Sequence, residues 1–209
     1  MFHKKKGLLY IVSAPSGAGK TTLCRQLSGA MPSLSYSISH TTRKPRPGEV
    51  EGEHYYFVSE EEFERIRLAG GFVEWANVHG NLYGTSKAEL ERLFDLGNDV
   101  ILDIDTQGAM QVRGSGVGGV FISLLPPSME ELERRLRGRD TDDEEVIRRR
   151  LERAVEEIRF IMDEKVYDYL IINDNLLTAL DALKSIIIAE KHRLANYDLQ
   201  LIKKKFGLN

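Results

Sequence analysis

The 209 residues of the chain are enough for one large core with inserted subdomains, but few for two independent domains. Hydrophobic residues make up 42% and charged residues 29%, and the net charge of −3 excludes a global basic field that would attract nucleic acid. The single cysteine, Cys24, excludes an intramolecular disulfide framework, no apolar run is long enough to span a bilayer, and residues 1–6 lack the pattern of a secretion signal. We therefore expect a cytoplasmic protein with no membrane or nucleic-acid partner.

Short apolar runs alternate with helical stretches along the chain. Leu8–Ser13 predicts a first strand, and a Gly-containing loop and the helix Lys20–Ala30 follow it directly. Further runs bounded by Gly, Pro, Asp or Asn predict strands at Val100–Asp105, Gly119–Leu125 and Tyr169–Asn173. Such runs separated by helices indicate an α/β fold whose parallel central sheet is buried on both faces.

Four further helices are predicted from a Ser/Thr-x-x-Glu pattern, in which the side chains of the first and last residues cap the helix start. The pattern occurs at Ser59 with Glu62, Ser86 with Glu89, Ser128 with Glu131 and Thr141 with Glu144. Apolar residues at helical spacing predict a last helix at about Leu177–Leu194, which should pack one face on the sheet.

Two segments depart from the alternation of strand and helix. Ser35–Gly84 combines hairpin-like and aromatic stretches around one short helix, which indicates an inserted mixed α/β lobe. Glu130–Glu157 is rich in arginine and acidic residues, and its pattern fits either a solvated helical hairpin or a functional helical segment.

The strongest chemical signal is A-P-S-G-A-G-K-T at Ala14–Thr21, between a strand and a helix, which is the context of a phosphate-binding P-loop. Gly17 and Gly19 would let backbone N–H groups converge on phosphate, Lys20 would bridge the β- and γ-phosphates, and the Thr21 hydroxyl would hold Mg²⁺. The first position of the motif holds alanine instead of glycine. The residues expected to bind a nucleoside triphosphate are Ala14, Pro15, Ser16, Gly17, Ala18, Gly19, Lys20, Thr21 and Thr22.

A carboxylate is expected at the end of a neighbouring strand, where P-loop enzymes organise the metal through water. The stretch V-I-L-D-I-D supplies Asp103 and Asp105, but it does not decide which of the two faces the metal. For each, a strand-end aspartate that caps the next helix is an equally good interpretation.

The P-loop alone does not identify the reaction. Asp105–Gly108 matches the D-x-x-G pattern of small GTPases, but those proteins recognise guanine with N-K-x-D, and the chain contains no Asn-Lys pair. We therefore interpret this match as chance.

A proline-stiffened loop carries Arg43 and Arg46, three residues apart. Two guanidinium groups on a rigid backbone suit a phosphate monoester, because each offers a planar fork of donors, and Tyr55 and Tyr83 could add phenolic donors. On its own this loop would be interpreted as a solvated surface loop.

The loop belongs to a series of spaced motifs along the chain. The motifs are S-H-T-T-R-x-P-R-P-G-E at 39–49, G-x-x-Y-x-F at 52–57, F-V-E-W-A at 72–76, G-N-L-Y-G-T at 80–85, D-I-D-x-Q-G at 103–108, P-P-S at 126–128, R-R-L-x-G-R at 134–139 and I-I-N-D at 171–174. In order and spacing this series resembles the guanylate kinases, and the bacterial enzymes most. The resemblance covers residues 7–191 and implies a P-loop three-layer fold that transfers the terminal phosphoryl group of ATP to GMP with Mg²⁺. It leaves open whether dGMP is also an acceptor.

The resemblance also implies roles for single residues. Those matching the phosphate grip on GMP are Arg43, Arg46, Tyr55 and Tyr83, and those matching guanine recognition are Ser39, Glu74 and Thr85. Asp103 and Asp105 match paired aspartates near the acceptor and the metal. Arg135, Arg139 and Arg150 match arginines of a lid that folds over the ATP phosphates, and with Lys20 and Arg43 they are the residues expected to act in catalysis. Asp140 follows Arg139 where relatives commonly carry glycine.

The same resemblance divides the chain into three parts. Residues 1–34, 87–126 and 165–209 would form the nucleotide-binding core, residues 35–86 the GMP-binding lobe, and residues 127–164 a lid. Because an open site would hydrolyse ATP, the lobe and the lid are expected to close over the core.

Glu74 also has a chemical argument of its own. Guanine presents N1–H and N2–H₂ on one edge, and a carboxylate can accept from both, whereas adenine presents an acceptor at N1 and no amino group beside it. From its local sequence alone, Glu74 fits a polar residue on a half-exposed strand equally well.

Two competing functions remain to be weighed. Guanylate-kinase-like domains also serve as non-catalytic binding modules, but those have commonly lost P-loop residues that are present here. A kinase for AMP or a pyrimidine monophosphate fits less well with Ser39, Glu74 and Thr85. The histidines show no metal-ligand spacing, so we expect no metal site built from protein groups alone.

Overall fold

A five-stranded parallel sheet forms the centre of the protein, in the order β2-β7-β1-β8-β9. The computed structural model describes residues 7–78, 80–138 and 143–208. The strands of this sheet are β1 (Leu9–Ser13), β2 (Leu34–Tyr36), β7 (Asp99–Ile104), β8 (Val120–Leu125) and β9 (Tyr169–Ile172). The predicted α/β fold with a parallel central sheet is confirmed.

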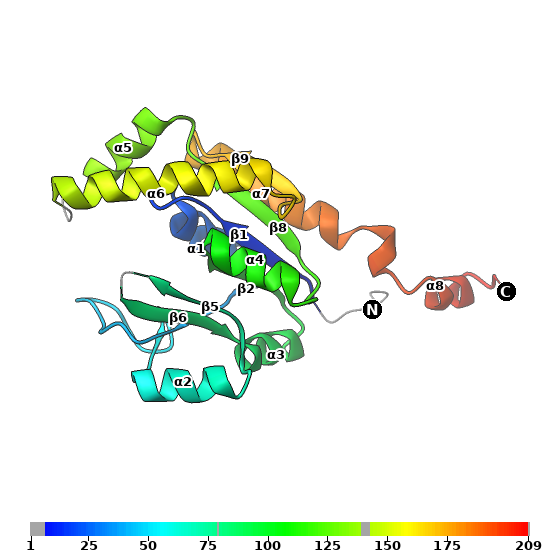
Figure 1. Cartoon of the computed structure of the whole chain (residues 1–209). Helices are drawn as coiled ribbons and strands as arrows, with labels where there is room; N and C mark the ends of the chain where they lie inside the picture. The colour runs from blue at the N-terminus through cyan, green and yellow to red at the C-terminus, as the bar shows by residue number, and fades with distance from the viewer. Residues whose placement is uncertain (1–6, 79, 139–142, 209) are drawn as a thin grey trace.

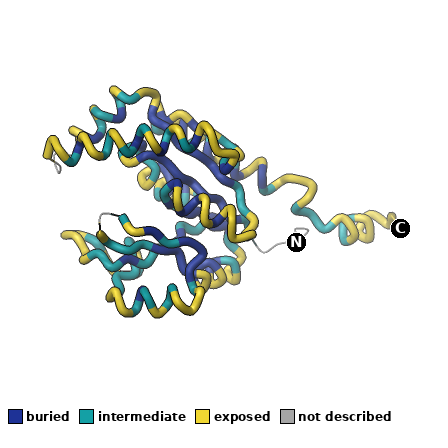
Figure 2. The backbone as a smooth tube through the Cα atoms, viewed as in Figure 1, coloured by how far each residue is buried: buried dark blue, intermediate teal, exposed yellow. Residues whose placement is uncertain are grey.

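Helices cover both faces of this sheet, as Figure 1 shows. On one face, α1 (Lys20–Ala30) and α7 (Leu176–Lys191) pack against a cluster that includes Tyr10 and Val12. On the other face, α3 (Lys87–Asp95) and α4 (Thr106–Gly114) pack against Leu9 and Ile11. Alternate residues of β1 thus point to opposite faces of the sheet, and both sets are fully or almost fully buried. This explains why the sequence of β1 is apolar at consecutive positions. Figure 2 shows this buried centre with exposed residues on the outer sides of the helices.

A second sheet of four strands lies beside the first, in the order β4-β3-β6-β5. Its strands are β3 (His40–Thr41), β4 (Tyr56–Phe57), β5 (Phe72–Val78) and β6 (Asn81–Ser86), with the helix α2 (Glu60–Leu68) between β4 and β5. β5 and β6 pair in antiparallel fashion, and their register shifts between Phe72 and Glu74. The boundary drawn from the sequence at residues 34/35 falls inside β2, a strand of the central sheet.

Two helices, α5 (Met129–Arg137) and α6 (Glu144–Asp163), pack on each other through a small apolar cluster that includes Leu132, Leu136 and Ile147. The predicted caps at Ser59, Ser86 and Ser128 are confirmed, since each side chain accepts a hydrogen bond from the backbone N–H three residues later. The prediction that Thr141 caps the next helix is wrong. Asp143 caps α6 and accepts from the backbone N–H of Val146, while Thr141 lies outside the described residues.

The last helix predicted from the sequence corresponds to α7 and ends earlier than expected, at Lys191 instead of Leu194. A short 3₁₀ turn, η1 (Leu194–Asn196), and the helix α8 (Leu199–Lys205) follow it and run away from the central sheet (Figure 1). None of the described helices is both long and apolar enough to cross a membrane.

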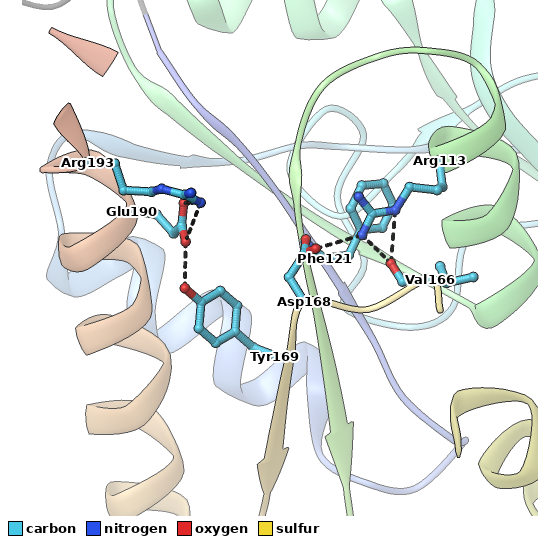
Figure 3. A network of polar contacts seen from close by, with 7 residues as sticks. All are labelled: Arg113, Phe121, Val166, Asp168, Tyr169, Glu190 and Arg193. Carbon is cyan, nitrogen blue, oxygen red and sulfur yellow. Dashed lines mark hydrogen bonds and ion pairs between the residues drawn. The ribbon is translucent and has the colours of Figure 1, made fainter. Parts of the chain in front are cut away.

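Polar contacts tie α4 and α7 to the edge where β8 and β9 begin (Figure 3). The Arg113 guanidinium lies over the Phe121 ring at 3.8 Å and donates to the Val166 carbonyl and to Asp168. Nearby, Glu190 accepts from the Tyr169 hydroxyl at 2.5 Å and pairs with Arg193. These contacts lie at the N-terminal ends of the strands, so they stabilise the fold from the end opposite the P-loop.

Candidate functional site

A cleft of about 750 Å³ opens between the P-loop, the second sheet and α6. It is lined by Ala14, Pro15, Ser16, Gly17, Gly19, Lys20, Thr21, Thr22, Ser39, Arg46, Tyr55, Glu74, Ala76, Val78, Tyr83, Asp103, Ile104, Asp105, Val146, Arg149, Arg150, Arg153 and Glu157. Most residues predicted to contact nucleotide thus line one continuous cavity, although they come from distant parts of the sequence.

The P-loop joins β1 to α1, and two of its glycines have left-handed backbone angles, with φ of 96° at Gly17 and 92° at Gly19. Space is restricted at both. A Cβ on Gly17 would lie 2.9 Å from Leu136 and 3.0 Å from Leu132, both on α5. A Cβ on Gly19 would lie 2.7 Å from the Asn173 side-chain nitrogen, which donates to the Ala18 carbonyl. The loop is therefore held from outside by α5 and by the residue after β9.

Lys20 is the first residue of α1, and its ammonium group pairs with Asp103 at 2.8 Å. It also donates to the Ile104 carbonyl, so β7 holds it from two sides. Burial alone would lower the pKa of Lys20, but the charge and hydrogen bond of Asp103 outweigh it and raise that pKa above its ordinary value. Lys20 therefore keeps its positive charge beside the P-loop.

The two strand-end aspartates differ in their partners. Asp103 accepts from the Tyr36 hydroxyl at 3.1 Å in addition to its pair with Lys20. Asp105 caps α4, since one carboxylate oxygen accepts from the backbone N–H of Gly108 at 2.8 Å. Its other oxygen lies 3.6 Å from the Arg153 guanidinium on α6. Asp105 thus caps a helix, as one of the two interpretations of the sequence has it, and it also lines the cleft.

Tyr55, just before β4, and Tyr83, on β6, lie edge to face with ring centres 5.9 Å apart. The Arg43 guanidinium lies over Tyr55, donates to the Tyr83 hydroxyl at 3.2 Å and forms an ion pair with Glu49 at 2.8 Å. That same Glu49 carboxylate accepts from the backbone N–H of Arg46 at 2.7 Å. Glu49 thus accepts from the Arg43 guanidinium and from the Arg46 backbone, and not from the Arg46 guanidinium. Arg46 lines the cleft, whereas Arg43 is not among the lining residues.

Glu74 is 5% exposed and lies at the cleft on β5. The buried Thr85 hydroxyl on β6 donates to its Oε1 at 2.6 Å, and the two residues face each other in the β5–β6 register. Burial raises the pKa of Glu74 to about 7, the nearby Asp105 charge adds to the increase, and the Thr85 hydrogen bond opposes it. A buried carboxylate with one oxygen fixed by a neighbour is suited to accept hydrogen bonds from a ligand in a defined direction.

The arginines of α5 and α6 separate into two groups. Arg149, Arg150 and Arg153 line the cleft from α6. Arg135 does not line it, because its guanidinium contacts Glu131 at 2.7 Å and donates to the Asn173 carbonyl at 2.9 Å. Arg139 lies outside the described residues.

Several residues of the site were not predicted from the sequence: Tyr36, Glu49, Arg149, Arg153, Glu157 and Asn173. Arg153 lies between two acids of the cleft, with Glu157 at 3.2 Å and Asp105 at 3.6 Å. Nothing in the local pattern of charges on α6 distinguishes Arg149 and Arg153 from the solvated arginines around them. Asn173 had a signal, since it stands in the I-I-N-D motif.

The described residues contain no cluster of three or more His, Cys, Asp or Glu side chains able to hold a metal. Among the oxygen-bearing side chains that line the cleft are Thr21, Asp103 and Asp105, and one Asp105 oxygen is buried with no hydrogen-bond partner among the described residues. Hard oxygen donors of this kind fit Mg²⁺, which commonly keeps waters and shares its coordination with substrate phosphates.

Comparisons with known proteins agree with this geometry. A family model described as "Guanylate kinase" matches residues 6–190. The chain is 55% identical to a guanylate kinase of Geobacter sulfurreducens, over 92% of this chain and 93% of the relative. It is 52% identical to one of Escherichia coli O157:H7, over 91% of each chain. A crystal structure of guanylate kinase from Anaplasma phagocytophilum superposes with a TM-score of 0.79 at 32% identity, covering 100% of both chains.

Proposed function

This chain belongs to the guanylate kinase family, and from that premise we propose how its residues transfer the terminal phosphoryl group of ATP to GMP. The observation that carries the proposal is one cleft that joins a P-loop to a buried carboxylate. Lys20 and Glu74 line the same cavity, one suited to phosphate and the other to the hydrogen-bond donors of a base.

ATP would bind with its phosphates on the P-loop, residues 14–22. Free backbone N–H groups before α1 would donate to the phosphate oxygens, and the start of the helix would add partial positive charge. Lys20, held charged by Asp103, would contact the β- and γ-phosphates. Thr21 would hold Mg²⁺ together with phosphate oxygens and water, and the bound ion would neutralise charge on the phosphates.

GMP would bind on the second sheet with its phosphate toward Arg43, Arg46, Tyr55 and Tyr83. The ligand phosphate would take the place of the Glu49 carboxylate. That carboxylate accepts from the Arg43 guanidinium and from the backbone N–H of Arg46. An anion of higher charge than a carboxylate competes well for these donors, because charge-assisted bonds to phosphate are strong.

Guanine would be recognised by Glu74, with Thr85 and Ser39 beside it. The carboxylate of Glu74 would accept from N1–H and N2–H₂ of the base, while Thr85 holds one of its oxygens in place. AMP offers an acceptor where guanine offers a donor, so the same carboxylate would reject it. The recognition elements address base and phosphate, and we propose that dGMP is an acceptor as well.

Little acid–base chemistry is required of the protein. The GMP phosphate is largely a dianion at neutral pH, because its second pKa is near 6, so it is already nucleophilic. The cleft would align it with the γ-phosphate of ATP, and Lys20, Arg139 and Arg150 would balance the charge of the transferring group. Arg135 would act by holding α5 against Asn173.

We further propose that residues 35–86, apart from the end of β2 at Ser35–Tyr36, act as a GMP-binding lobe and residues 127–164 as a lid, both closing over the remaining core. Closure would exclude water and so protect ATP from hydrolysis. A reaction between two nucleotides of intermediary metabolism fits a protein of the cytoplasm.

The test is a coupled assay of ADP release with ATP and each of AMP, GMP, CMP, UMP and IMP as acceptor. We expect turnover with GMP to exceed that with every other monophosphate. A non-catalytic binding module is the competing function, and it would bind GMP in calorimetric titration but release no ADP. The retained P-loop, with Lys20 paired to Asp103, favours the enzyme.

A further inference from the structure

The helix α4 of the central core makes direct contact with β5, the strand that carries Glu74. Gln111, on α4, places its side-chain amide against the backbone of Trp75. Its oxygen accepts from the Trp75 N–H at 3.1 Å, and its nitrogen donates to the Trp75 carbonyl at 2.8 Å. One side chain therefore satisfies both backbone groups of the residue next to Glu74.

This contact has the form of a strand pairing. β5 is the last strand of its sheet, so one edge pairs with β6 and the other faces α4. The amide of Gln111 mimics a peptide unit of a neighbouring strand on that outer edge. The register of β5 also shifts between Phe72 and Glu74, and such irregularities redirect side chains beside functional sites. The Gln111 contact thus holds β5 against α4 at Trp75, directly beside the position from which the Glu74 side chain projects.

One turn earlier on the same face of α4 lies Gly108, which is buried against the Glu74 side chain. A Cβ on Gly108 would lie 2.8 Å from Oε2 of Glu74 and 3.4 Å from an oxygen of Asp105. The carboxylate therefore rests between the Thr85 hydroxyl on one side and the backbone of α4 on the other. Gly108 has no left-handed backbone angle, so its need for glycine comes from this close approach alone.

We propose that Gly108 and Gln111 form a positioning pair that fixes the Glu74 carboxylate for guanine, which makes α4 part of the base-specificity apparatus. The inference rests on the proposed function of Glu74 and names residues that act through it without touching the ligand. Thr85 fixes one carboxylate oxygen, Gly108 leaves the space for the other, and Gln111 holds the strand from which the side chain projects.

The discriminating substrate is IMP, because hypoxanthine keeps the N1–H of guanine and lacks its N2 amino group. A correctly placed carboxylate gains a second hydrogen bond from GMP and not from IMP. Displacing the carboxylate therefore costs GMP more than IMP, whereas a general loss of stability affects both alike. The ratio of kcat/KM for GMP to that for IMP reports the position of Glu74.

Gln111→Met keeps the length of the side chain and removes both hydrogen bonds to Trp75. Because Gln111 is exposed, the variant is expected to fold, and the GMP/IMP ratio should fall about threefold to tenfold, as for one or two exposed hydrogen bonds. Gly108→Ala places a methyl group against Oε2, and the ratio should fall about tenfold or more. Alanine is the better helix former, so a purely structural role would not lower the ratio.

Arg113→Met is the matched control on the same helix. It removes the bonds to Val166 and Asp168 at the other end of the sheet, so it should lower thermal stability and leave the GMP/IMP ratio unchanged. KM for ATP should stay within about twofold in all three variants. An unchanged ratio in both positioning variants, or an equal fall in the control, overturns the inference. If the wild-type protein releases no ADP with GMP, it is the proposed function that fails. If Gln111→Met does not fold, the GMP/IMP ratio of Gly108→Ala alone decides whether the inference holds.

Discussion

Thr85 donates its hydroxyl hydrogen to Oε1 of Glu74 across 2.6 Å, and both side chains are buried. The two residues come from neighbouring strands, so the geometry of the pair is set by the β5–β6 register. One carboxylate oxygen is thus fixed before any ligand arrives, and the pKa of the group lies near neutrality.

Glu74→Gln should shrink the preference for GMP over AMP. Thr85 favours the amide oxygen at the position of Oε1, which turns the amide NH₂ toward the base, where it can donate to N1 of adenine but opposes N1–H of guanine. Sites built on such bonds reject the wrong analogue by roughly 10⁴–10⁵ in kcat/KM, and we expect the variant to lose roughly 100-fold or more of this ratio. Glu89→Gln, a buried acid on α3 away from the cleft, serves as control. An unchanged GMP/AMP ratio would mean that Glu74 does not recognise the base.

The activity with GMP should depend on the protonation of Glu74. Its pKa of about 7 means that the accepting carboxylate is depleted below neutral pH, so kcat/KM for GMP should fall about tenfold per unit as the pH drops further. The GMP phosphate takes up a proton near pH 6, which lowers kcat/KM further on the acid side. Plots of kcat/KM against pH for wild type and Glu74→Gln separate the two titrations, because the variant should show only that of the phosphate. Superimposable profiles would contradict the assignment.

The same carboxyl group should link stability to pH. Its folded-state pKa of about 7 lies above the ordinary value of 4.5, so the folded protein binds the proton more tightly than the unfolded chain. The contribution to the free energy of unfolding is therefore present below about pH 4.5 and is lost as the pH rises to about 7. Melting temperatures of wild type should decline across this window relative to those of Glu74→Gln. Parallel curves would show that the pKa is not raised.

Arg43→Ala and Arg46→Ala should each weaken GMP about tenfold to a hundredfold, since a hydrogen bond to a charged group contributes roughly 1.5–3 kcal/mol. Their distance from the P-loop predicts little change in ATP affinity. Lys44→Ala is the matched control, because it removes one positive charge from the same loop while only its backbone carbonyl contacts Arg43. Calorimetric titration with each nucleotide tests this, and equal losses for GMP and ATP would disprove the assignment of the loop to the acceptor.

Lys20→Met should abolish phosphoryl transfer, lowering kcat by several orders of magnitude, while GMP still binds with near-normal affinity. The variant leaves Asp103 without its ion pair, although Tyr36 continues to donate to it, so a modest loss of thermal stability is expected as well. Single-turnover measurements with a folded sample separate the two effects. Near-normal turnover would contradict the P-loop assignment.

The sequence predicted those parts of the site whose signal is local. The P-loop stands between a strand and a helix within a few residues, and the structure has α1 over the predicted range Lys20–Ala30. The cap of α6 shows the limit of such signals. Thr141 and Asp143 are both good capping residues two positions apart, and the local pattern did not distinguish them.

Contacts between distant segments had no local signal. Glu74 and Thr85 were placed together only by the family resemblance, since they lie on different strands. The D-T-Q-G stretch appeared as a chance match to a GTPase motif, and its glycine instead meets the Glu74 carboxylate. On α6, the direction of Arg153 depends on how the helix is rotated against the core, which the charge pattern does not specify.

The packing of α5 on the phosphate loop affects the choice of an inactive reference protein. Any side chain at Gly17 would strain the backbone and press on Leu132 and Leu136, which belong to the cluster that joins α5 to α6. An inactive variant made at Gly17 would combine two effects, a distorted P-loop and weaker packing of α5 and α6 on that loop. A substitution of Lys20 is the better inactive reference, because its side chain can be shortened without disturbing that packing.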